Sequence, residues 1–168
     1  MAAVVQASRY HDFSCGHRVV GHESKCRHLH GHNYRVYFYV QMVKDKQGSA
    51  AKIDQVGRVM DFTVIKEILC EWVEQIWDHK MLLWEDDPLL PYLGSMWIAN
   101  EGLEICNNSI VTVPFNPTAE NMAEYLVEGV GPMLLSQPTV VEKYGLCVLQ
   151  KVEIWETRKC MASYEKEI

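Results

Sequence analysis

The sequence predicts an α+β fold in which two helices cover one face of an antiparallel sheet. Residues 31–44 and 146–157 alternate apolar and polar side chains, as half-buried strands do. Within 62–76 and 122–134, apolar residues instead recur at helical spacing. Strands at both ends of the chain and helices between them are typical of an α+β domain.

The first half of the chain predicts two strands and a helix. The first strand is expected within residues 3–20, and the polar residues 21–29 form the loop to the second strand at about 31–44. Asp61 is placed to cap a helix that ends near Trp77. The expected apolar face of this helix comprises Phe62, Ile65, Ile68, Leu69, Trp72 and Ile76.

The second half begins with an extended loop and strand insertion at about 85–115, which includes a short strand at 109–115. A second helix follows, and Gly131-Pro132 is expected to interrupt it. Residues 146–157 form the third main strand, and 160–164 form a final short strand. The apolar positions of the second helix are 122, 125, 126, 130, 133 and 134.

Composition favours one globular domain, residues 1–168, that binds small molecules or other copies of itself. The chain is 48% hydrophobic, and its formal net charge of −6 argues against nucleic acid or an anionic membrane as partner. It has no apolar run of 18 residues that would span a membrane. We expect the six cysteines to be reduced thiols in the cytoplasm, because nothing marks the chain for secretion.

Histidines at the start of the second strand suggest a metal site. His30 and His32 lie two positions apart, so in an extended chain they point to the same face. A catalytic zinc site takes three protein ligands and keeps an open position. His17 could supply the third imidazole if the first two strands form an antiparallel pair. Spacing alone leaves three competitors for that place, His11, His22 and His28.

Two further groups could carry acid–base chemistry. Cys26 lies in the polar loop before His30, where a dication could lower the pKa of the thiol. It could equally be a fourth ligand of a closed structural zinc site or an ordinary loop cysteine. Asp78 could orient the ring of His79 or raise its pKa, although a surface pair of this kind is common.

Glu156 carries a charge on a face that should be buried. The alternation of 146–157 places it on the same side as Val148, Val152 and Ile154. An unpaired buried charge is costly and needs hydrogen-bond donors. Arg158 or Lys159 could supply them, or a ligand could do so through the N–H groups of a guanidine-like heterocycle edge.

The motifs together resemble those of the 6-pyruvoyl-tetrahydropterin synthases and their bacterial relatives, the 6-carboxy-tetrahydropterin synthases of queuosine biosynthesis. Three residues separate Cys26 from His30-Gly31-His32, as in the bacterial branch, whereas the animal enzymes have a longer gap. The insertion at 85–115 departs from the compact bacterial pattern. Six segments carry the resemblance in the family's order: 13–18, Cys26 with 30–34, 57–62, 78–80, 116–121 and 154–157.

The resemblance implies a tunnelling fold (T-fold) that assembles into rings, as a tetramer or hexamer. It implies zinc held by His17, His30 and His32, with Cys26 as the catalytic thiol and Asp78 and His79 as an acid/base pair. Glu156 would anchor the pterin ring, and Thr118 and Glu120 would lie near it.

The activity that the resemblance implies is conversion of 7,8-dihydroneopterin triphosphate to 6-carboxy-5,6,7,8-tetrahydropterin, acetaldehyde and triphosphate. A 6-pyruvoyl-tetrahydropterin synthase and a non-catalytic pterin- or zinc-binding protein of the same fold are the alternatives.

Overall fold

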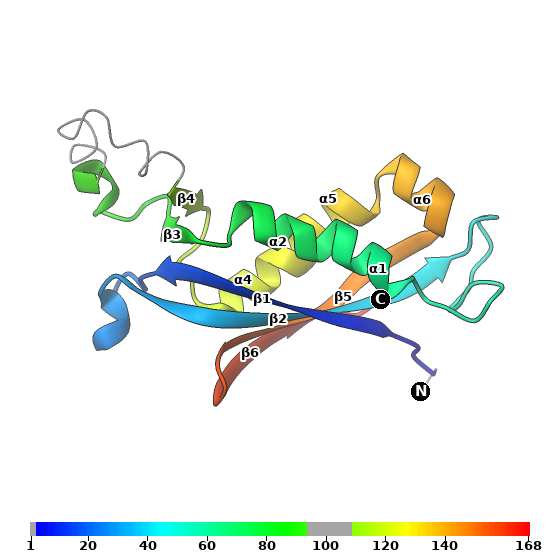
Figure 1. Cartoon of the computed structure of the whole chain (residues 1–168), viewed down its shortest axis with the longest axis horizontal. Helices are drawn as coiled ribbons and strands as arrows, with labels where there is room; N and C mark the ends of the chain where they lie inside the picture. Colours follow the sequence, from blue (N-terminus) through cyan, green and yellow to red (C-terminus); the bar gives the residue numbers. More distant parts are fainter. Residues whose placement is uncertain (1–2, 94–108) are drawn as a thin grey trace.

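The computed structural model describes residues 3–93 and 109–168, and its helices lie on one face of a sheet (Figure 1). The strands are β1 (Ala7–His17), β2 (His30–Lys44), β3 (Lys80–Trp84), β4 (Ile110–Val113), β5 (Leu146–Thr157) and β6 (Cys160–Glu165). The first long helix comprises α1 (Phe62–Ile65), η2 (Lys66–Cys70) and α2 (Glu71–Ile76). The second comprises α4 (Ala119–Tyr125), η4 (Leu126–Val130) and α5 (Gly131–Leu135), and α6 (Pro138–Tyr144) follows it.

The sheet has the strand order β4-β3-β1-β2-β5-β6, which confirms the α+β class. Its pairs β1/β2, β2/β5 and β5/β6 are antiparallel. The sequence did not predict β3, and this strand pairs in parallel with both β1 and β4. The sheet is therefore mixed, and the prediction of a wholly antiparallel sheet is wrong at this edge.

The β1/β2 pair brings the predicted histidines together. The two strands are antiparallel, with His17 opposite His30 and Cys15 opposite His32. Between these pairs, Gly16 faces Gly31, and a Cβ atom on Gly31 would lie 3.0 Å from the carbonyl oxygen of Cys15. A side chain at Gly31 would therefore crowd the backbone between the two pairs.

The first long helix begins as predicted but turns a different face to the core. Asp61 caps it, because its side chain accepts a hydrogen bond of 2.8 Å from the N–H of Thr63. Phe62 and Ile76 are 58% and 39% exposed, contrary to the expected apolar face. The π-helical turn η2 lies between α1 and α2 and changes the helical period there. The buried residues of the segment are Val64, Ile65, Leu69, Cys70, Val73 and Trp77.

The second long helix continues through the predicted interruption. Gly131 and Pro132 form the first turn of α5, directly after the π-helical turn η4. Pro132 has no N–H to donate to the preceding turn, and the π-helical turn η4 directly before it changes the helical hydrogen-bond pattern there. The sequence pattern did not predict α6, which has Pro138 in its first turn, a position that favours proline.

Strand β5 changes its buried face part of the way along. Cys147 and Leu149 are buried in its first part, whereas Val152 and Ile154 are buried in its second. The register with β2 shifts between Tyr39 and Val40, opposite this change. The expectation that Val148 shares the buried face is therefore wrong, because a bulge reverses the alternation.

Two further predictions concern residues of which the structure describes only a part. Cysteines 15, 26, 70, 147 and 160 are free thiols, and Cys106 lies outside the described residues. The predicted insertion at 85–115 is described at 85–93 and 109–115, and its remainder lies outside the described residues. Within the described ranges, no helix is long and apolar enough to span a membrane.

Gly145 is a position at which we expect a large loss of stability on substitution. It has φ 82° and ψ 173°, and an added Cβ would lie 2.5 Å from the carbonyl oxygen of Lys44. Gly145→Ala should lower the free energy of unfolding by about 3 kcal/mol or more, since this backbone region is essentially restricted to glycine. Gly48→Ala is the matched control.

Gly48 has φ 81° but nothing within 4 Å of the added Cβ. Its substitution should cost only about 1 kcal/mol, the strain of the left-handed backbone. Urea denaturation of both variants measures the difference. Equal losses would show that the contact with Lys44 carries no penalty.

Candidate metal centre

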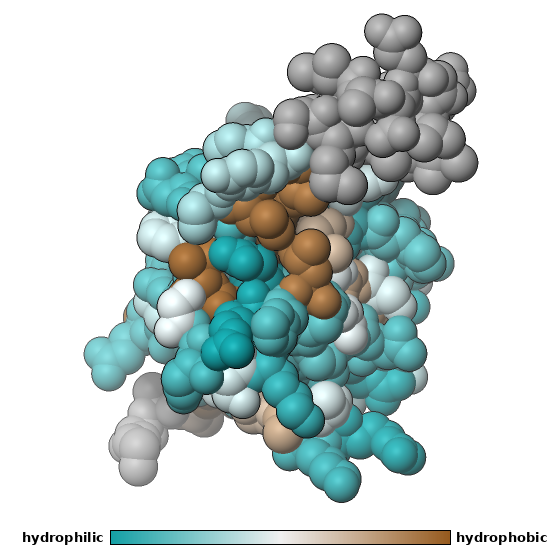
Figure 2. All heavy atoms as spheres, turned by 90° about the vertical axis from the view of Figure 1, so that its left-hand side faces the viewer, coloured by the Kyte–Doolittle hydropathy of each residue, from teal (hydrophilic) through white to brown (hydrophobic). Residues whose placement is uncertain are grey.

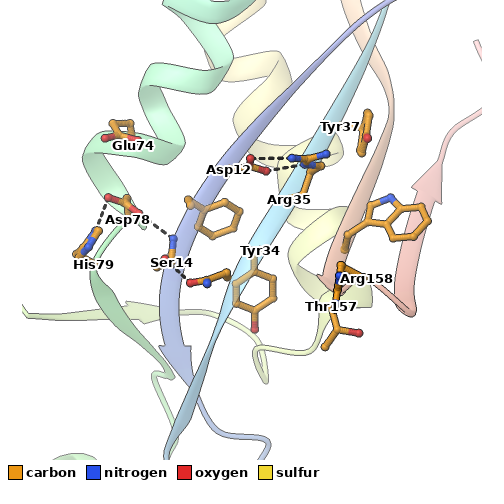
Figure 3. Close-up of a pocket in the computed structure, with 13 residues that line it drawn as sticks. Asp12, Ser14, Tyr34, Arg35, Tyr37, Glu74, Asp78, His79, Thr157 and Arg158 are labelled. Atoms are coloured by element: carbon orange, nitrogen blue, oxygen red, sulfur yellow. Dashed lines mark hydrogen bonds and ion pairs between the residues drawn. The ribbon is translucent and has the colours of Figure 1, made fainter.

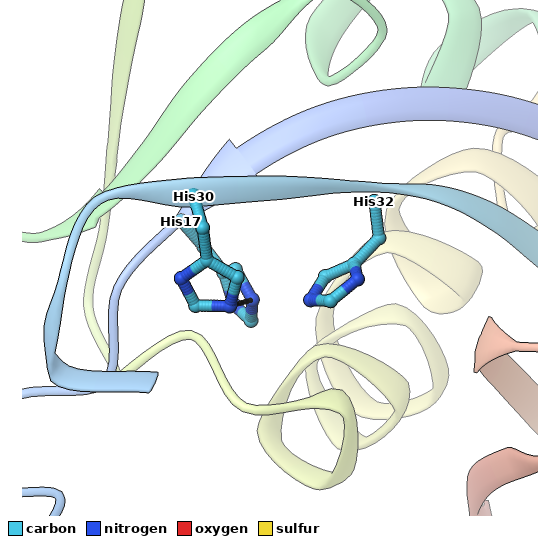
Figure 4. A group of neighbouring side chains, drawn as sticks. All are labelled: His17, His30 and His32. Carbon is cyan, nitrogen blue, oxygen red and sulfur yellow. Dashed lines mark hydrogen bonds between the residues drawn. The ribbon is translucent and has the colours of Figure 1, made fainter. Parts of the chain in front are cut away.

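Three histidine side chains converge beneath the sheet at the end where β1 stops and β2 starts. One ring nitrogen from each of His17, His30 and His32 lies within 4.8 Å of the others. The Nε2 atoms of His17 and His30 are 3.1 Å apart. All three rings lie on the same side of β2 (Figure 4), as expected for positions two apart on one strand and a paired position on the next.

The Nδ1 atoms of two of these rings are held by backbone carbonyls. His17 Nδ1 lies 2.7 Å from the carbonyl oxygen of Pro117, and His30 Nδ1 lies 2.7 Å from that of His28. A carbonyl only accepts hydrogen bonds, so each Nδ1 carries the hydrogen and each neutral ring presents a lone pair at Nε2. Two such lone pairs 3.1 Å apart repel each other unless a cation lies between them.

The third ring supports the same interpretation. His32 Nε2 is buried, and within the part of the chain that the structure describes it has no hydrogen-bond partner. Burial lowers the pKa of His32, so its ring is neutral and keeps a lone pair at neutral pH. Three converging imidazoles, two of them with Nδ1 held by backbone carbonyls, are a donor set that suits a divalent transition metal such as zinc. The residues present therefore fit a bound metal ion.

Glu156 lies against this histidine cluster. Its Oε1 is 3.2 Å from His17 Nε2 and 3.3 Å from His32 Nε2. The contact with His17 lowers the pKa of the Glu156 carboxyl and outweighs burial, which raises it. Neither Arg158 nor Lys159 pairs with it among the described residues. Among the described residues the carboxylate lies against the histidine cluster instead, so the alternative of a neighbouring basic side chain is not what the structure shows.

Tyr34 also belongs to this arrangement, although the sequence suggested only a core aromatic. Its hydroxyl donates a hydrogen bond of 3.3 Å to Glu156 Oε1, and its ring stands edge-on to those of His17 and His32. Burial raises the pKa of Tyr34, so the hydroxyl keeps its proton and acts as a donor. Its place four residues after His30 on one strand face was the available signal.

A pocket of about 300 Å³ opens beside the cluster. His17, Cys26 and Glu156 line it, together with Thr118 and Glu120 at the start of α4. Thr118 caps that helix by accepting a hydrogen bond of 3.2 Å from the N–H of Asn121. The end of the molecule at which β1 stops shows polar side chains next to a group of apolar ones (Figure 2).

Cys26 is placed at this pocket by η1 (Lys25–Arg27), a short 3-10 turn between β1 and β2. Its carbonyl accepts a hydrogen bond of 2.8 Å from the N–H of Val19. Among the described residues, the group of possible metal donors consists of the three histidines and does not include Cys26. This favours a thiol beside the metal position over a fourth ligand.

Asp78 and His79 lie in a different pocket, of about 780 Å³ (Figure 3). Asp78 Oδ2 is 2.5 Å from His79 Nδ1, and its Oδ1 accepts a hydrogen bond of 2.8 Å from the N–H of Ser14. Burial raises the pKa of Asp78, but these two partners outweigh it and lower the pKa. The His79 side chain is 82% exposed. The predicted pair therefore exists, but one chain does not bring it to the histidine cluster.

The three histidines that competed for the third ligand position lie outside the cluster. His11 Nε2 is 2.7 Å from a carboxylate oxygen of Glu74, away from the cluster. His22 lines the smaller pocket, and His28 contributes only its backbone carbonyl to His30. The convergence of His17 with His30 and His32 is confirmed. The carbonyl of Pro117 could not be predicted, because a backbone group leaves no signal in the residue type.

Comparison with known proteins agrees with this geometry. Residues 6–167 match the family model described as 6-pyruvoyl tetrahydropterin synthase. The 6-carboxy-5,6,7,8-tetrahydropterin synthase of Rickettsia felis is 32% identical over 132 residues, 78% of this chain and 83% of that protein. The protein of the same name from Haemophilus influenzae is 28% identical over 159 residues, 95% of this chain and 97% of that protein.

Solved structures share the fold. An uncharacterized protein from Wolinella succinogenes superposes with a TM-score of 0.75 at 26% identity, covering 99% of this chain and 100% of that one. The Caenorhabditis elegans 6-pyruvoyl tetrahydropterin synthase has a TM-score of 0.57 at 22% identity, covering 98% and 97%, and shows the fold alone. The predicted T-fold is confirmed. The chain belongs to the 6-pyruvoyl tetrahydropterin synthase family.

Proposed function

We propose that this protein is a zinc-dependent 6-carboxy-5,6,7,8-tetrahydropterin synthase. It would convert 7,8-dihydroneopterin triphosphate and water to 6-carboxytetrahydropterin, acetaldehyde and triphosphate, for the synthesis of queuosine or another 7-deazapurine. One observation carries the proposal: three imidazole nitrogens converge, two of them on rings that backbone carbonyls hold, beside a pocket that contains a thiol. The names of the curated relatives support the carboxypterin product.

His17, His30 and His32 would hold the zinc ion. When bound, the ion would act as a Lewis acid that polarises the hydroxyl-bearing side chain of the substrate. Among the described residues, Cys26 is not part of this donor group and lines the pocket beside it. The pocket side is therefore left for substrate.

Cys26 would take the proton from the substrate carbon next to the polarised hydroxyl. Its position in the pocket that His17 and Glu156 also line makes this possible. Thr118 and Glu120, at the start of α4, border the same pocket and would contact the bound pterin. The Glu156 carboxylate, kept ionised, would accept hydrogen bonds from the pterin N–H edge and fix the ring.

Asp78 and His79 would supply the second acid/base group from another copy of the chain. Asp78 fixes the His79 ring through Nδ1 and leaves its Nε2 free to move a proton. The pair lines a pocket with Asp12, Ser14 and Asn33, apart from the histidine cluster. We therefore propose a homo-oligomeric ring, a tetramer or hexamer, in which one chain's pair completes another chain's pocket.

Replacing Glu156 by glutamine should weaken substrate binding far more than zinc binding. The amide keeps the shape but cannot accept two charge-assisted hydrogen bonds from the pterin edge, so the Michaelis constant should rise by about tenfold or more. Steady-state kinetics measure this, and a chelator titration measures zinc affinity in the same variant. Glu153→Gln, which removes a carboxylate on the other face of β5, is the matched control.

An equal loss of zinc affinity in Glu156→Gln would instead make Glu156 a metal ligand, which its distances to His17 and His32 permit. Unchanged kinetics would exclude both roles.

The activity is tested by incubating the zinc-loaded protein with 7,8-dihydroneopterin triphosphate and identifying the pterin and any aldehyde by mass spectrometry. 6-Carboxytetrahydropterin with acetaldehyde supports the proposal. 6-Pyruvoyltetrahydropterin without aldehyde would assign the other branch of the family. Zinc binding without turnover of any dihydropterin would indicate a binding protein.

A further inference from the structure

The segment between β4 and α4 is tied to the chain that leaves β1 by one amide side chain. Asn116 Oδ1 accepts a hydrogen bond of 2.9 Å from the N–H of Val20. Asn116 Nδ2 donates one of 2.8 Å to the carbonyl of the same residue. An amide has both the acceptor and the donor that this pairing needs, whereas a carboxylate or an aliphatic side chain does not.

The backbone of Asn116 is held as firmly as its side chain. Its carbonyl accepts hydrogen bonds from the N–H of Thr118, at 2.7 Å, and from Asn121 Nδ2, at 2.9 Å. Pro117 lies between Asn116 and Thr118, and its carbonyl accepts a hydrogen bond of 2.7 Å from His17 Nδ1. Asn116 therefore fixes the group that orients the His17 ring.

Residues 17–20, which Asn116 binds through Val20, also hold the turn that carries the Cys26 thiol. The N–H of Val19 donates to the carbonyl of Cys26, one residue before the Val20 peptide that Asn116 binds. Arg18 donates from its guanidinium to the carbonyl of Arg27, at 3.4 Å, and to Asp87, at 2.8 Å. The chain at 17–20 thus lies between Asn116 on one side and the Cys26 turn on the other.

We infer that Asn116 is a positioning residue for the metal centre and the thiol. Through Pro117 it selects the His17 tautomer with hydrogen at Nδ1 and a lone pair at Nε2. Through Val20 it holds the chain that supports the Cys26 turn. The inference rests on the metal site of the proposed function. Groups that orient a ligating histidine typically change metal affinity by about 10- to 100-fold when they are lost.

Two variants test the role with zinc alone as the probe. Asn116→Asp keeps the size and the acceptor but loses the donor, and Asn116→Ala loses both. Competition with a chelator measures the zinc dissociation constant. Nitrogen-15 NMR of the metal-free protein measures the His17 tautomer. Leu135→Ala, which removes a buried side chain on α5, is the control for a loss of stability alone.

We expect the zinc dissociation constant to rise about 10- to 100-fold in both Asn116 variants, and the tautomer with hydrogen at Nε2 to appear. Leu135→Ala should leave both readings unchanged while lowering the unfolding midpoint. With substrate, the Asn116 variants should lose kcat more than they raise KM, since the groups that they displace act in the reaction.

Zinc affinity and a His17 tautomer that match wild type in either Asn116 variant would overturn the inference while leaving the proposed function intact. If Asn116 and Leu135 variants of equal stability showed an equal rise in the zinc dissociation constant, the inference would be overturned too. A wild-type protein that binds no zinc would overturn both this inference and the proposed metal site.

Discussion

Cys26→Ala is expected to remove turnover and leave the zinc content of the protein unchanged. The thiol borders the pocket beside the histidine cluster, but the cluster of metal donors forms without it. Loss of a general acid–base group lowers turnover by about 10²- to 10⁴-fold. Single-turnover kinetics with 7,8-dihydroneopterin triphosphate measure the effect, and elemental analysis of the purified variant measures zinc.

Cys70→Ala is the matched control, because it removes a buried thiol of the first long helix. It should reduce stability slightly and leave turnover per folded molecule unchanged. Loss of zinc from Cys26→Ala would show a closed four-ligand site and contradict the proposed role. Retained turnover would contradict it as well.

The histidine site is the part of the structure that the sequence predicts best. Extending the alternation of β2 backwards puts His30 and His32 on one face, and an antiparallel β1 places His17 opposite His30. Both steps use only the period of a strand and the pairing of neighbouring strands. What spacing left open was the choice among four histidines for the third ligand, and the resemblance favoured His17, which the structure places beside His30 and His32.

The edge of the sheet could not be predicted in the same way. Strand β3 is only five residues long, and its buried Leu82 and Leu83 are adjacent, so it shows no alternation. Its partners β1 and β4 are distant in the sequence and pair with it in parallel. The position of Asp78 and His79 depends on this strand, because they immediately precede it. The sequence pattern therefore could not predict that these two residues lie apart from the histidine cluster.

Irregular turns account for the errors in side-chain direction. The π-helical turn η2 moves Ile76, which follows it, away from the core face, and the register shift opposite Tyr39 does the same for Val148. Each adds a residue to a regular period, and residue types alone do not mark where this happens. Glu156 comes after the register shift in β5, as Val152 and Ile154 do. The alternation among these three residues therefore still predicted the face on which Glu156 lies.

A mixture of two inactive variants should recover activity if one chain's Asp78 and His79 complete another chain's pocket. His32→Ala removes a proposed metal donor, and His79→Ala removes the proposed acid/base group, so each homo-oligomer should be inactive. In oligomers assembled from equal amounts of both chains, half of the triads and half of the pairs are intact. Random assembly therefore gives about a quarter of wild-type activity, because each site combines groups from two chains.

The matched control mixes His32→Ala with Cys26→Ala. The histidine cluster and Cys26 belong to the same pocket of one chain, so every site in this mixture carries one defect and no activity should return. Co-expression with two different tags, followed by tandem purification and steady-state assay, measures both mixtures. Activity in neither mixture would show that the pair at 78–79 does not act across chains. Recovery in the control mixture would place Cys26 across the subunit boundary, since only a site shared between chains can be restored by mixing.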